Sequence, residues 1–458
     1  MTQIPTEIVV HYLDEIGWGK YQWSIFEQCM ISYFNIQFRN LSIGYFAAIY
    51  AIDLGISNTQ KGLMGTLFQL GCFIGSYFWG NLSDRHGRAS TVKKAGFIFI
   101  FVHLVWIFAD NIFVILILCF ASGFGNTGEM VIIPVLFKEF CPTKKLNFIT
   151  KLTSGFAIGG AFIAFSAISI EIIGSNYLPD WCFMAIILLF CHVLMSILRI
   201  GLDETPGFLA SKGKFSQTEE LLSKIAKING KDSISISISP VDNTNAQSVK
   251  APIKMKAIFS KKYVKSTVFV SIIYFFIYFG SFSMNLFMPR FLQQFSFAVR
   301  YTIILIQQLS GIPGIFLASF LVNTKLGRKH TLLLSLAITS FSVYLFIFLE
   351  HIVAVIIVIM MLASVNFASF GSLFTLSPEI YPTEIRNSAM GFFFTWSRIG
   401  SSISPFIGGM ILDIENGKEV ALALFASGYL IASLSTVFIE ETRPSLKTTI
   451  LIEENSPQ

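Results

Sequence analysis

Long apolar runs alternate with short polar connections along the 458 residues of this chain. Each run is bounded by charged or turn-forming residues and is long enough to cross the hydrocarbon core of a bilayer as an α-helix. The pattern therefore predicts an all-α membrane protein with twelve membrane-spanning helices, six on each side of a polar centre. The runs lie near residues 22–46, 60–82, 92–109, 112–137, 148–171, 178–200, 264–288, 299–322, 331–349, 352–376, 388–412 and 420–439.

The polar stretches define five regions. We expect a cytoplasmic N-terminal segment, a first six-helix half, a cytoplasmic linker with an amphipathic helix, a second six-helix half and a cytoplasmic tail. Their bounds are 1–21, 22–200, 201–263, 264–439 and 440–458.

Within the linker, Leu221 and Ile225 belong to an apolar stripe at helical spacing. Ser216 followed three residues later by Glu219 is typical of a capping box at the start of such a helix. The Ser-rich run at 233–239 alternates like a strand, but its low complexity favours a linker. We therefore expect one short amphipathic helix followed by irregular chain.

Two short motifs each occur twice, and both pairs are separated by the same 240 residues. A shared spacing indicates two homologous halves related by pseudo-symmetry, the architecture of a transporter that alternates access around a central site. The matching residues are Gly87, Arg88, Glu139, Pro142, Thr143 and Asn147 in the first half and Gly327, Arg328, Glu379, Pro382, Thr383 and Asn387 in the second.

Composition excludes a soluble protein, because 53% of the residues are hydrophobic and only 13% are charged. Lysine and arginine gather in alternate connections, which predicts that these connections and both termini face the cytoplasm. The net charge of +6 follows from this topology and does not require a nucleic acid partner. We expect a multi-pass protein of the plasma membrane or of an intracellular vesicle membrane.

Neither catalysis nor a cofactor is indicated. All six cysteines lie in or at the ends of apolar runs, which favours packing over disulfides. The polar regions contain no nucleotide-binding loop, metal-ligand cluster or nucleophile motif. We therefore expect no enzymatic activity, no cofactor and no metal.

Small residues four positions apart predict close helix packing in two spans. Gly71 and Gly75 form one pair, and Gly155 and Gly159 form the other.

The segment GNLSDRHGR at 80–88 resembles the loop 2–3 signature of the major facilitator superfamily, and it lies between the second and third spans as that signature does. The resemblance implies the major facilitator fold, a close helix approach at Gly80 and a salt bridge between Asp84 and Arg88 that favours one closed face. The second-half copy, NTKLGRKH, lacks the acidic residue, which leaves a second salt bridge in doubt. The gating residues that the resemblance implies are Gly80, Asp84, Arg85, Gly87, Arg88, Glu139, Gly327, Arg328, Glu379 and Arg386.

Further segments resemble one branch of that superfamily. KEFCP at 138–142, DETPGFLASKGK at 203–214 and EIYPTEIRNSAMG at 379–391 look like synaptic-vesicle-glycoprotein-like proteins and organic cation and anion transporters. Only a short loop follows the first span, so the resemblance points to relatives without a large extracellular loop.

Ionisable residues inside spans are expensive unless they face a partner or water, so they mark candidate substrate contacts. The first span carries a polar stripe in which Gln28, Ser32, Asn35 and Arg39 share one helical face. Such a stripe either lines a cavity or bonds to neighbouring helices, and both interpretations stay open. The full set of predicted substrate contacts is Gln28, Ser32, Asn35, Arg39, Asn126, Glu129, Tyr274, Tyr278, Asn285, Asn366 and Arg398.

Two mid-span arginines, Arg39 and Arg398, favour an anionic substrate, because a guanidinium binds a carboxylate in bidentate fashion. Organic-anion carriers resemble this chain in placing arginine in the eleventh span. The alternative is that Glu129 or Glu27 neutralises one of the arginines in a structural ion pair. Glu27 and Glu129 are also the candidate proton carriers.

The leading hypothesis is a monomeric secondary transporter of a small organic anion, such as a carboxylate metabolite or vitamin, with protons as the candidate coupling ion. The rival hypotheses are an organic-cation carrier, with Glu129 and Glu27 as counter-charges, and a carrier of sugar-like solutes. A transporter-derived receptor that moves no substrate is the alternative from another class.

Overall fold

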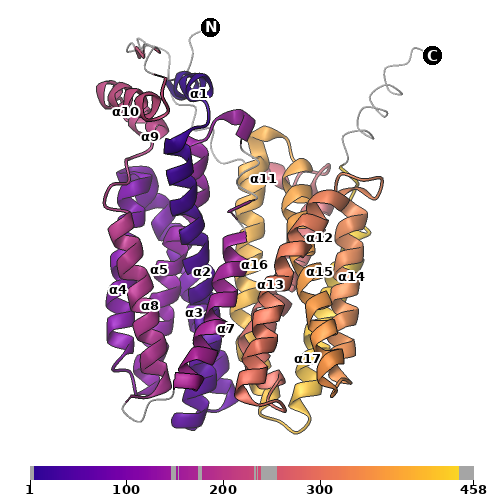
Figure 1. Ribbon diagram of the computed structural model, residues 1–458. Helices are drawn as coiled ribbons and strands as arrows, with labels where there is room; N and C mark the ends of the chain where they lie inside the picture. Colours follow the sequence, from indigo (N-terminus) through magenta and orange to yellow (C-terminus); the bar gives the residue numbers. More distant parts are fainter. Residues whose placement is uncertain are drawn as a thin grey trace, which may run out of the picture. The chain divides into compact units, whose positions relative to one another are not determined.

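The computed structural model describes residues 5–145, 151–152, 154–173, 178–231, 234, 236–238 and 255–442. Within these ranges every regular element is a helix, and no strand occurs there (Figure 1). The helices of the first half are α1 (Pro5–Ile16), α2 (Lys20–Asp53), α3 (Asn58–His86), α4 (Arg88–Trp106), α5 (Ile112–Phe140), η1 (Thr143–Lys145), α7 (Ser154–Ile173) and α8 (Asp180–Leu198). They are followed by α9 (Pro206–Ser211), α10 (Phe215–Ile228), α11 (Met255–Ile258), α12 (Val264–Phe291), α13 (Phe297–Leu321), α14 (Gly327–Ile347), α15 (Ile352–Glu379), α16 (Thr383–Leu412) and α17 (Gly417–Thr436).

The predicted spans correspond to the twelve long helices of the described chain: α2, α3, α4, α5, α7, α8 and the six from α12 to α17. Nine of these described helices are long and apolar enough to cross a membrane by length and composition alone. The other three, α2, α3 and α16, contain Arg39, Asp84 and Arg398 among their polar residues. The all-α membrane fold predicted from the sequence is confirmed.

The chain divides into two compact units. Unit 1 comprises residues 1–42, 70–160 and 174–249, and unit 2 comprises residues 43–69, 161–173 and 250–458. The boundary cuts through α2, α3 and α7, because one end of each of these first-half helices clusters with the second-half helices.

Unit 1 has an apolar core at the end of its long helices where α1, α9 and α10 gather (Figure 1). Val9 and Leu13 of α1 and Leu222 and Ile225 of α10 are buried in it. The amphipathic helix predicted in the linker is present, and its apolar face packs on protein. Helix α1 itself was not predicted.

The capping box predicted for α10 is wrong. The helix begins at Phe215, and Lys214 is its N-cap without a side-chain cap. Glu219 instead accepts a hydrogen bond from the backbone of Ile238, 19 residues later. The Glu219 carboxylate therefore bonds to a residue distant in sequence and does not cap the start of α10.

The predicted glycine pairs lie at close backbone contacts within unit 1. A Cβ atom at Gly71 would lie 2.1 Å from the Phe120 carbonyl oxygen, and one at Gly159 would lie 2.1 Å from the Phe34 carbonyl oxygen. Only a residue without a side chain fits at such distances.

Several predictions lie outside the described residues. These are most of the Ser-rich run at 233–239, Asn147 and residues 443–458 of the tail.

Candidate functional site

A buried charged cluster lies in unit 1 between α2, α5 and α8. Arg39 and Glu129 are both fully buried, and the Arg39 guanidinium donates to Glu129 Oε2 at 2.6 Å. Arg39 also donates to Asn126 Oδ1 at 2.8 Å and lies over the Phe99 ring, 3.8 Å from its centroid. The structure thus brings three predicted residues together, and the alternative in which Glu129 pairs with Arg39 is the observed one.

Arg199 completes this cluster and was missed from the sequence. It is the C-cap of α8, its side chain is 3% exposed, and it donates to Glu129 Oε1 at 2.5 Å and to Ser32 Oγ at 2.7 Å. Two guanidinium groups therefore share one carboxylate, and this group of three carries a net charge of +1. The sequence offered only one indication of this role, namely that Arg199 is a single arginine at the end of an apolar run.

Two stacked histidines adjoin Arg39. The rings of His103 on α4 and His192 on α8 lie 4.7 Å apart at an angle of 11°. Arg39 donates to His192 Nε2 at 2.7 Å, so that nitrogen must be an acceptor, and the imidazole is neutral with its proton on Nδ1, which faces the Leu188 carbonyl. Neither histidine was predicted to contribute.

The polar stripe on α2 faces its neighbours in unit 1 in this structure. Ser32, Asn35 and Arg39 are each at most 1% exposed. Asn35 contacts Met195 on α8, whereas Gln28 is half-buried and its backbone carbonyl accepts from Ser32. Of the two interpretations, bonding to adjacent helices describes the observed geometry.

The predicted residues of unit 2 form a chain of neutral hydrogen bonds. Gln308 donates to Asn285 at 3.3 Å, and the Asn285 amide donates to the Ser281 carbonyl at 2.8 Å. The Ser281 hydroxyl bonds Asn366 at 3.3 Å and Tyr429 at 2.8 Å. The structure therefore joins Asn285 and Asn366 through Ser281, and it adds Gln308 and Tyr429.

Arg398 lies on α16, outside that chain of hydrogen bonds. Its guanidinium donates to Gln69 Oε1 at 3.3 Å, and it is the charge that acts on the Tyr278 hydroxyl. Tyr278 stacks on Tyr274 at 6.5 Å, and Tyr274 in turn stacks on Phe393 at 5.5 Å. A half-buried guanidinium can bind a carboxylate through charge-assisted hydrogen bonds.

The predicted gating residues of unit 1 surround the start of α4. Gly87 has a φ of +100°, and the Glu204 carboxylate accepts from the backbone of Arg88 at 2.7 Å and of Ala89 at 3.1 Å. The Arg88 side chain bonds Glu139 at 3.1 Å. Thr205 also bonds Glu139, so the linker, α4 and α5 are tied together.

Unit 2 repeats this arrangement at the start of α14. Gly327 has a φ of +73°, and Glu441 accepts from the backbone of Arg328 and of Lys329, each at 3.0 Å. Arg328 pairs with Glu379 at 3.1 Å, and Thr442 donates to Glu379 at 2.5 Å. A second salt bridge therefore exists: Glu379, at the end of α15, pairs with Arg328 as Glu139 pairs with Arg88, although no acidic residue stands at the position equivalent to Asp84.

The repeat thus includes a third motif that the sequence reading missed. Glu204-Thr205 and Glu441-Thr442 occupy equivalent positions, each after the last span of its half. The two copies could have been recognised in the sequence, because one half contains the letters ETP and the other contains ETRP.

The remaining gating residues make weaker contacts. Asp84 is 75% exposed and lies 3.4 Å from Arg88, so this predicted pair is present but solvent-exposed. Arg85 is exposed, and Arg386 donates to the Tyr381 carbonyl at 3.4 Å. Within the described residues of unit 1, a Cβ at Gly80 would meet only Val131, at 4.0 Å, and the close helix approach implied at Gly80 stays a prediction.

The candidate proton carriers differ in environment. Glu129 is enclosed by two guanidinium groups, whereas Glu27 is exposed and makes no ion pair within the described ranges. The described chain also holds no group of three or more His, Cys, Asp or Glu side chains that could bind a metal.

Comparison with known proteins gives consistent matches. A model of the Major Facilitator Superfamily matches residues 29–405 and 303–454. The chain is 25% identical over 403 residues to a putative niacin/nicotinamide transporter, NiaP, of Bacillus subtilis, covering 86% of this chain and 90% of that protein. It is 24% identical over 460 residues to the synaptic vesicle 2-related protein of Pongo abelii, covering 95% and 81%. It is also 28% identical over 264 residues to the 4-hydroxybenzoate transporter PcaK of Acinetobacter baylyi, covering 56% and 55%.

Solved structures share the fold. The inward-open xylose transporter XylE from E. coli superposes with a TM-score of 0.73 at 17% identity, covering 93% of this chain and 98% of that one. The nucleoside transporter NupG gives a TM-score of 0.65 at 12% identity, covering 90% and 98%. These are transporters and not enzymes.

Proposed function

Because the chain belongs to the Major Facilitator Superfamily and is an integral multi-pass secondary transporter, we propose that its substrate is a small organic anion that carries a carboxylate. The observation that carries this proposal is the excess of guanidinium groups over carboxylates among the buried charged side chains of the described spans. Arg39 and Arg199 share Glu129 alone in unit 1, and Arg398 is half-buried in unit 2.

The surroundings of Arg398 support a planar ligand. Its contact with Gln69 joins it to a neutral amide, and the Tyr274 and Tyr278 rings lie on the same side of α12. A carboxylate would gain a charge-assisted hydrogen bond to Arg398 while an attached ring packed on Tyr278, which is partly exposed, whereas Tyr274 is fully buried behind it. Two relatives are named for niacin and for 4-hydroxybenzoate, and both of these solutes combine a ring with a carboxylate.

An organic cation is less compatible with the charged side chains of the described spans. Its proposed counter-charges were Glu129 and Glu27, but Glu129 is already bound by two arginines. Releasing Glu129 would leave two buried guanidinium groups without their carboxylate, which is strongly unfavourable.

We further propose that transport is coupled to protons and that Glu27 carries the proton. A proton on Glu129 would have to replace two charge-assisted hydrogen bonds, whereas Glu27 is accessible on α2. Glu27→Gln is expected to abolish stimulation of uptake by a pH gradient while leaving solute exchange intact.

The decisive experiment measures uptake into liposomes of purified protein. Radiolabelled nicotinate, 4-hydroxybenzoate, an organic cation and xylose are tested with and without a pH gradient. We expect uptake of the carboxylates alone, and its loss in Arg398→Ala, because the variant lacks the guanidinium. Lys325→Gln is the matched control, since Lys325 is an exposed cation in the connection before α14.

Two outcomes would contradict the proposal. One is uptake of the cation alone, unchanged in Arg398→Ala. The other is the absence of transport for every class while a solute still raises the unfolding temperature, which would indicate a receptor.

A further inference from the structure

Unit 2 contains a cavity of about 380 Å³ at the end of its helices where α12 finishes and α13 begins. Its walls come from the last turns of α2, the first turn of α3, the end of α12 and Arg300 of α13. All lining residues belong to unit 2. The volume lies within the range of small-molecule sites.

Three basic side chains line this cavity, namely Lys61, Arg290 and Arg300. Arg290 acts electrostatically on both of the others, so its positive charge repels those of Lys61 and Arg300. Like charges gathered at one concave surface raise the local potential and favour a bound anion.

The one carboxylate among the lining residues, Asp413, is already engaged. It accepts from the backbone of Asn58 at 2.9 Å and of Thr59 at 2.8 Å, and from the Thr59 hydroxyl at 2.6 Å. Burial tends to raise the pKa of the Asp413 carboxyl, but the hydrogen bonds from Thr59 and Asn58 outweigh this and hold the pKa below its usual value. Its charge therefore stabilises the start of α3.

The two arginines retain unused donors. Within the described chain, the exposed side chain of Arg290 makes no hydrogen bond and no ion pair, and the buried Arg300 Nε atom has no acceptor. Among the residues that the structure describes, the Arg300 side chain otherwise donates only to backbone carbonyls, those of Gln293 at 3.4 Å and Phe295 at 3.2 Å. Glu171 also acts on Arg300, but it is exposed and forms no salt bridge in the described part.

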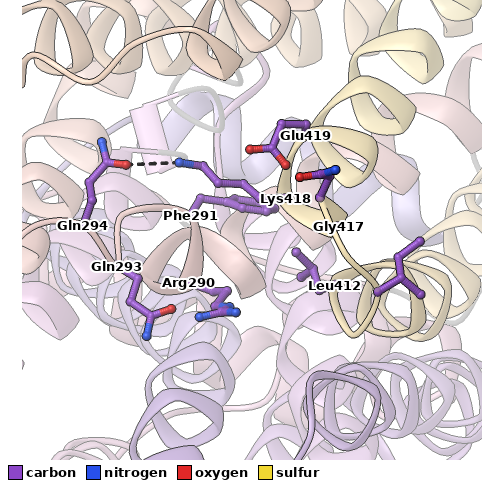
Figure 2. A pocket seen from close by; sticks show the side chains of 10 residues that line it. Arg290, Phe291, Gln293, Gln294, Leu412, Gly417, Lys418 and Glu419 are labelled. Atoms are coloured by element: carbon purple, nitrogen blue, oxygen red, sulfur yellow. Dashed lines mark hydrogen bonds between the residues drawn. The ribbon is translucent and has the colours of Figure 1, made fainter.

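A neighbouring hollow shares Arg290 and Gln293 with this cavity but differs in charge (Figure 2). There Lys418 donates to Gln294 at 3.2 Å, and Glu419 lies close to it. Figure 2 shows the Arg290 guanidinium apart from the Glu419 carboxylate. Lys418 therefore has a neighbouring counter-charge in Glu419, whereas in the cavity Asp413 acts on Lys61 alone among the three basic side chains for which an interaction is resolved.

This cavity is distant from the Arg398 region. Tyr278, on which Arg398 acts, precedes Arg290 by 12 residues on α12, and this spacing corresponds to about 18 Å along a helix. The cavity also lies at the opposite end of α13 from the Gly327 motif, whose connection is expected to face the cytoplasm.

We propose that the cavity lined by Lys61, Arg290 and Arg300 is a second anion site, which binds the carboxylate of the transported solute at the non-cytoplasmic end before the solute reaches Arg398. The choice of ligand rests on the proposed function. Arg290 and Arg300 supply the free donors, and Lys61 supplies a further positive charge. An arriving carboxylate relieves the repulsion among them.

Transport kinetics test the site. Arg290→Gln and Arg300→Gln are expected to raise KM for 4-hydroxybenzoate roughly tenfold, the loss of one charge-assisted hydrogen bond, with kcat nearly unchanged. Arg290→Lys should keep most of the affinity, and Lys325→Gln should behave as wild type. A fall in kcat at unchanged KM, or an equal effect of Lys325→Gln, would overturn the inference.

Direct binding separates this inference from the proposed function. Calorimetry with 4-hydroxybenzoate on Arg398→Ala is expected to retain a salt-sensitive site, which disappears when Arg290→Gln is added. If wild type transports no carboxylate but this binding is seen, the second site stands and the proposed function fails. If wild type transports carboxylates while both arginine variants leave KM and binding unchanged, the second site alone is refuted.

Discussion

Glu129 holds two positive charges inside unit 1. Its two oxygens accept from Arg39 at 2.6 Å and from Arg199 at 2.5 Å, and all three side chains are at most 3% exposed. A buried ion pair adds little net stability when intact, but removal of one partner leaves an uncompensated charge. The carboxylate is therefore the critical member of the cluster.

Glu129→Gln is expected to destabilise the protein by about 3–5 kcal/mol, because both guanidinium groups lose their counter-charge. The free energy of unfolding in detergent micelles measures this loss. Arg199→Gln is the matched control and should cost less, since the Arg39–Glu129 pair remains neutral. Equal losses in the two variants would show that charge balance does not govern the cluster.

Glycine spacing sets how closely helices pack in unit 1. Gly71 on α3 faces α5, where a Cβ would lie 2.1 Å from the Phe120 carbonyl oxygen and 2.8 Å from the Phe124 nitrogen. Both contacts are with backbone, which cannot rotate away as a side chain can. The helices would have to separate to admit a methyl group.

Gly71→Ala is therefore expected to cost about 1–3 kcal/mol of unfolding free energy, the usual effect of overpacking. Gly391→Ala on α16 is the control, because a Cβ there meets nothing within 4 Å and alanine favours the helix. A destabilisation by Gly391→Ala as large as that by Gly71→Ala would remove close packing as the explanation.

The two halves repeat one arrangement of charge at their linker and tail ends. In each, a glutamate after the last span accepts from the backbone at the start of the third helix, and an arginine pairs with a glutamate at the end of the fourth. Each arrangement lies wholly within its own unit. Both therefore hold helices together inside a half, and their role in gating remains a proposal.

Glu204→Gln and Glu441→Gln should have parallel effects, because each removes a negative charge from a helix N-terminus. We expect each to lower the unfolding free energy by about 1 kcal/mol, and the double variant to show the sum. Glu220→Gln, an exposed position on α10, should have no effect. A large loss in one half only would contradict the equivalence of the two motifs.

Several features of the site were predictable because they depend on local pattern. Arg39, Glu129 and Arg398 could be recognised as charged residues within apolar runs. The 240-residue repeat showed that Arg88 and Arg328 occupy equivalent positions. Arg199 and His192 did not stand out, because one ends an apolar run and the other is a single polar residue inside one. Their importance comes from contacts with Arg39 and Glu129 on other helices.

The sequence by itself determined the twelve spans, the two related halves and the transporter fold, because bilayer thickness fixes the length of an apolar helix and a repeat needs no contacts to be recognised. Only the tertiary structure decided that Glu129 joins Arg39 to Arg199, and that Lys61, Arg290 and Arg300 line one cavity. The physical reason is that such pairings depend on how each helix is rotated and packed. A span that is apolar on most faces does not encode that rotation.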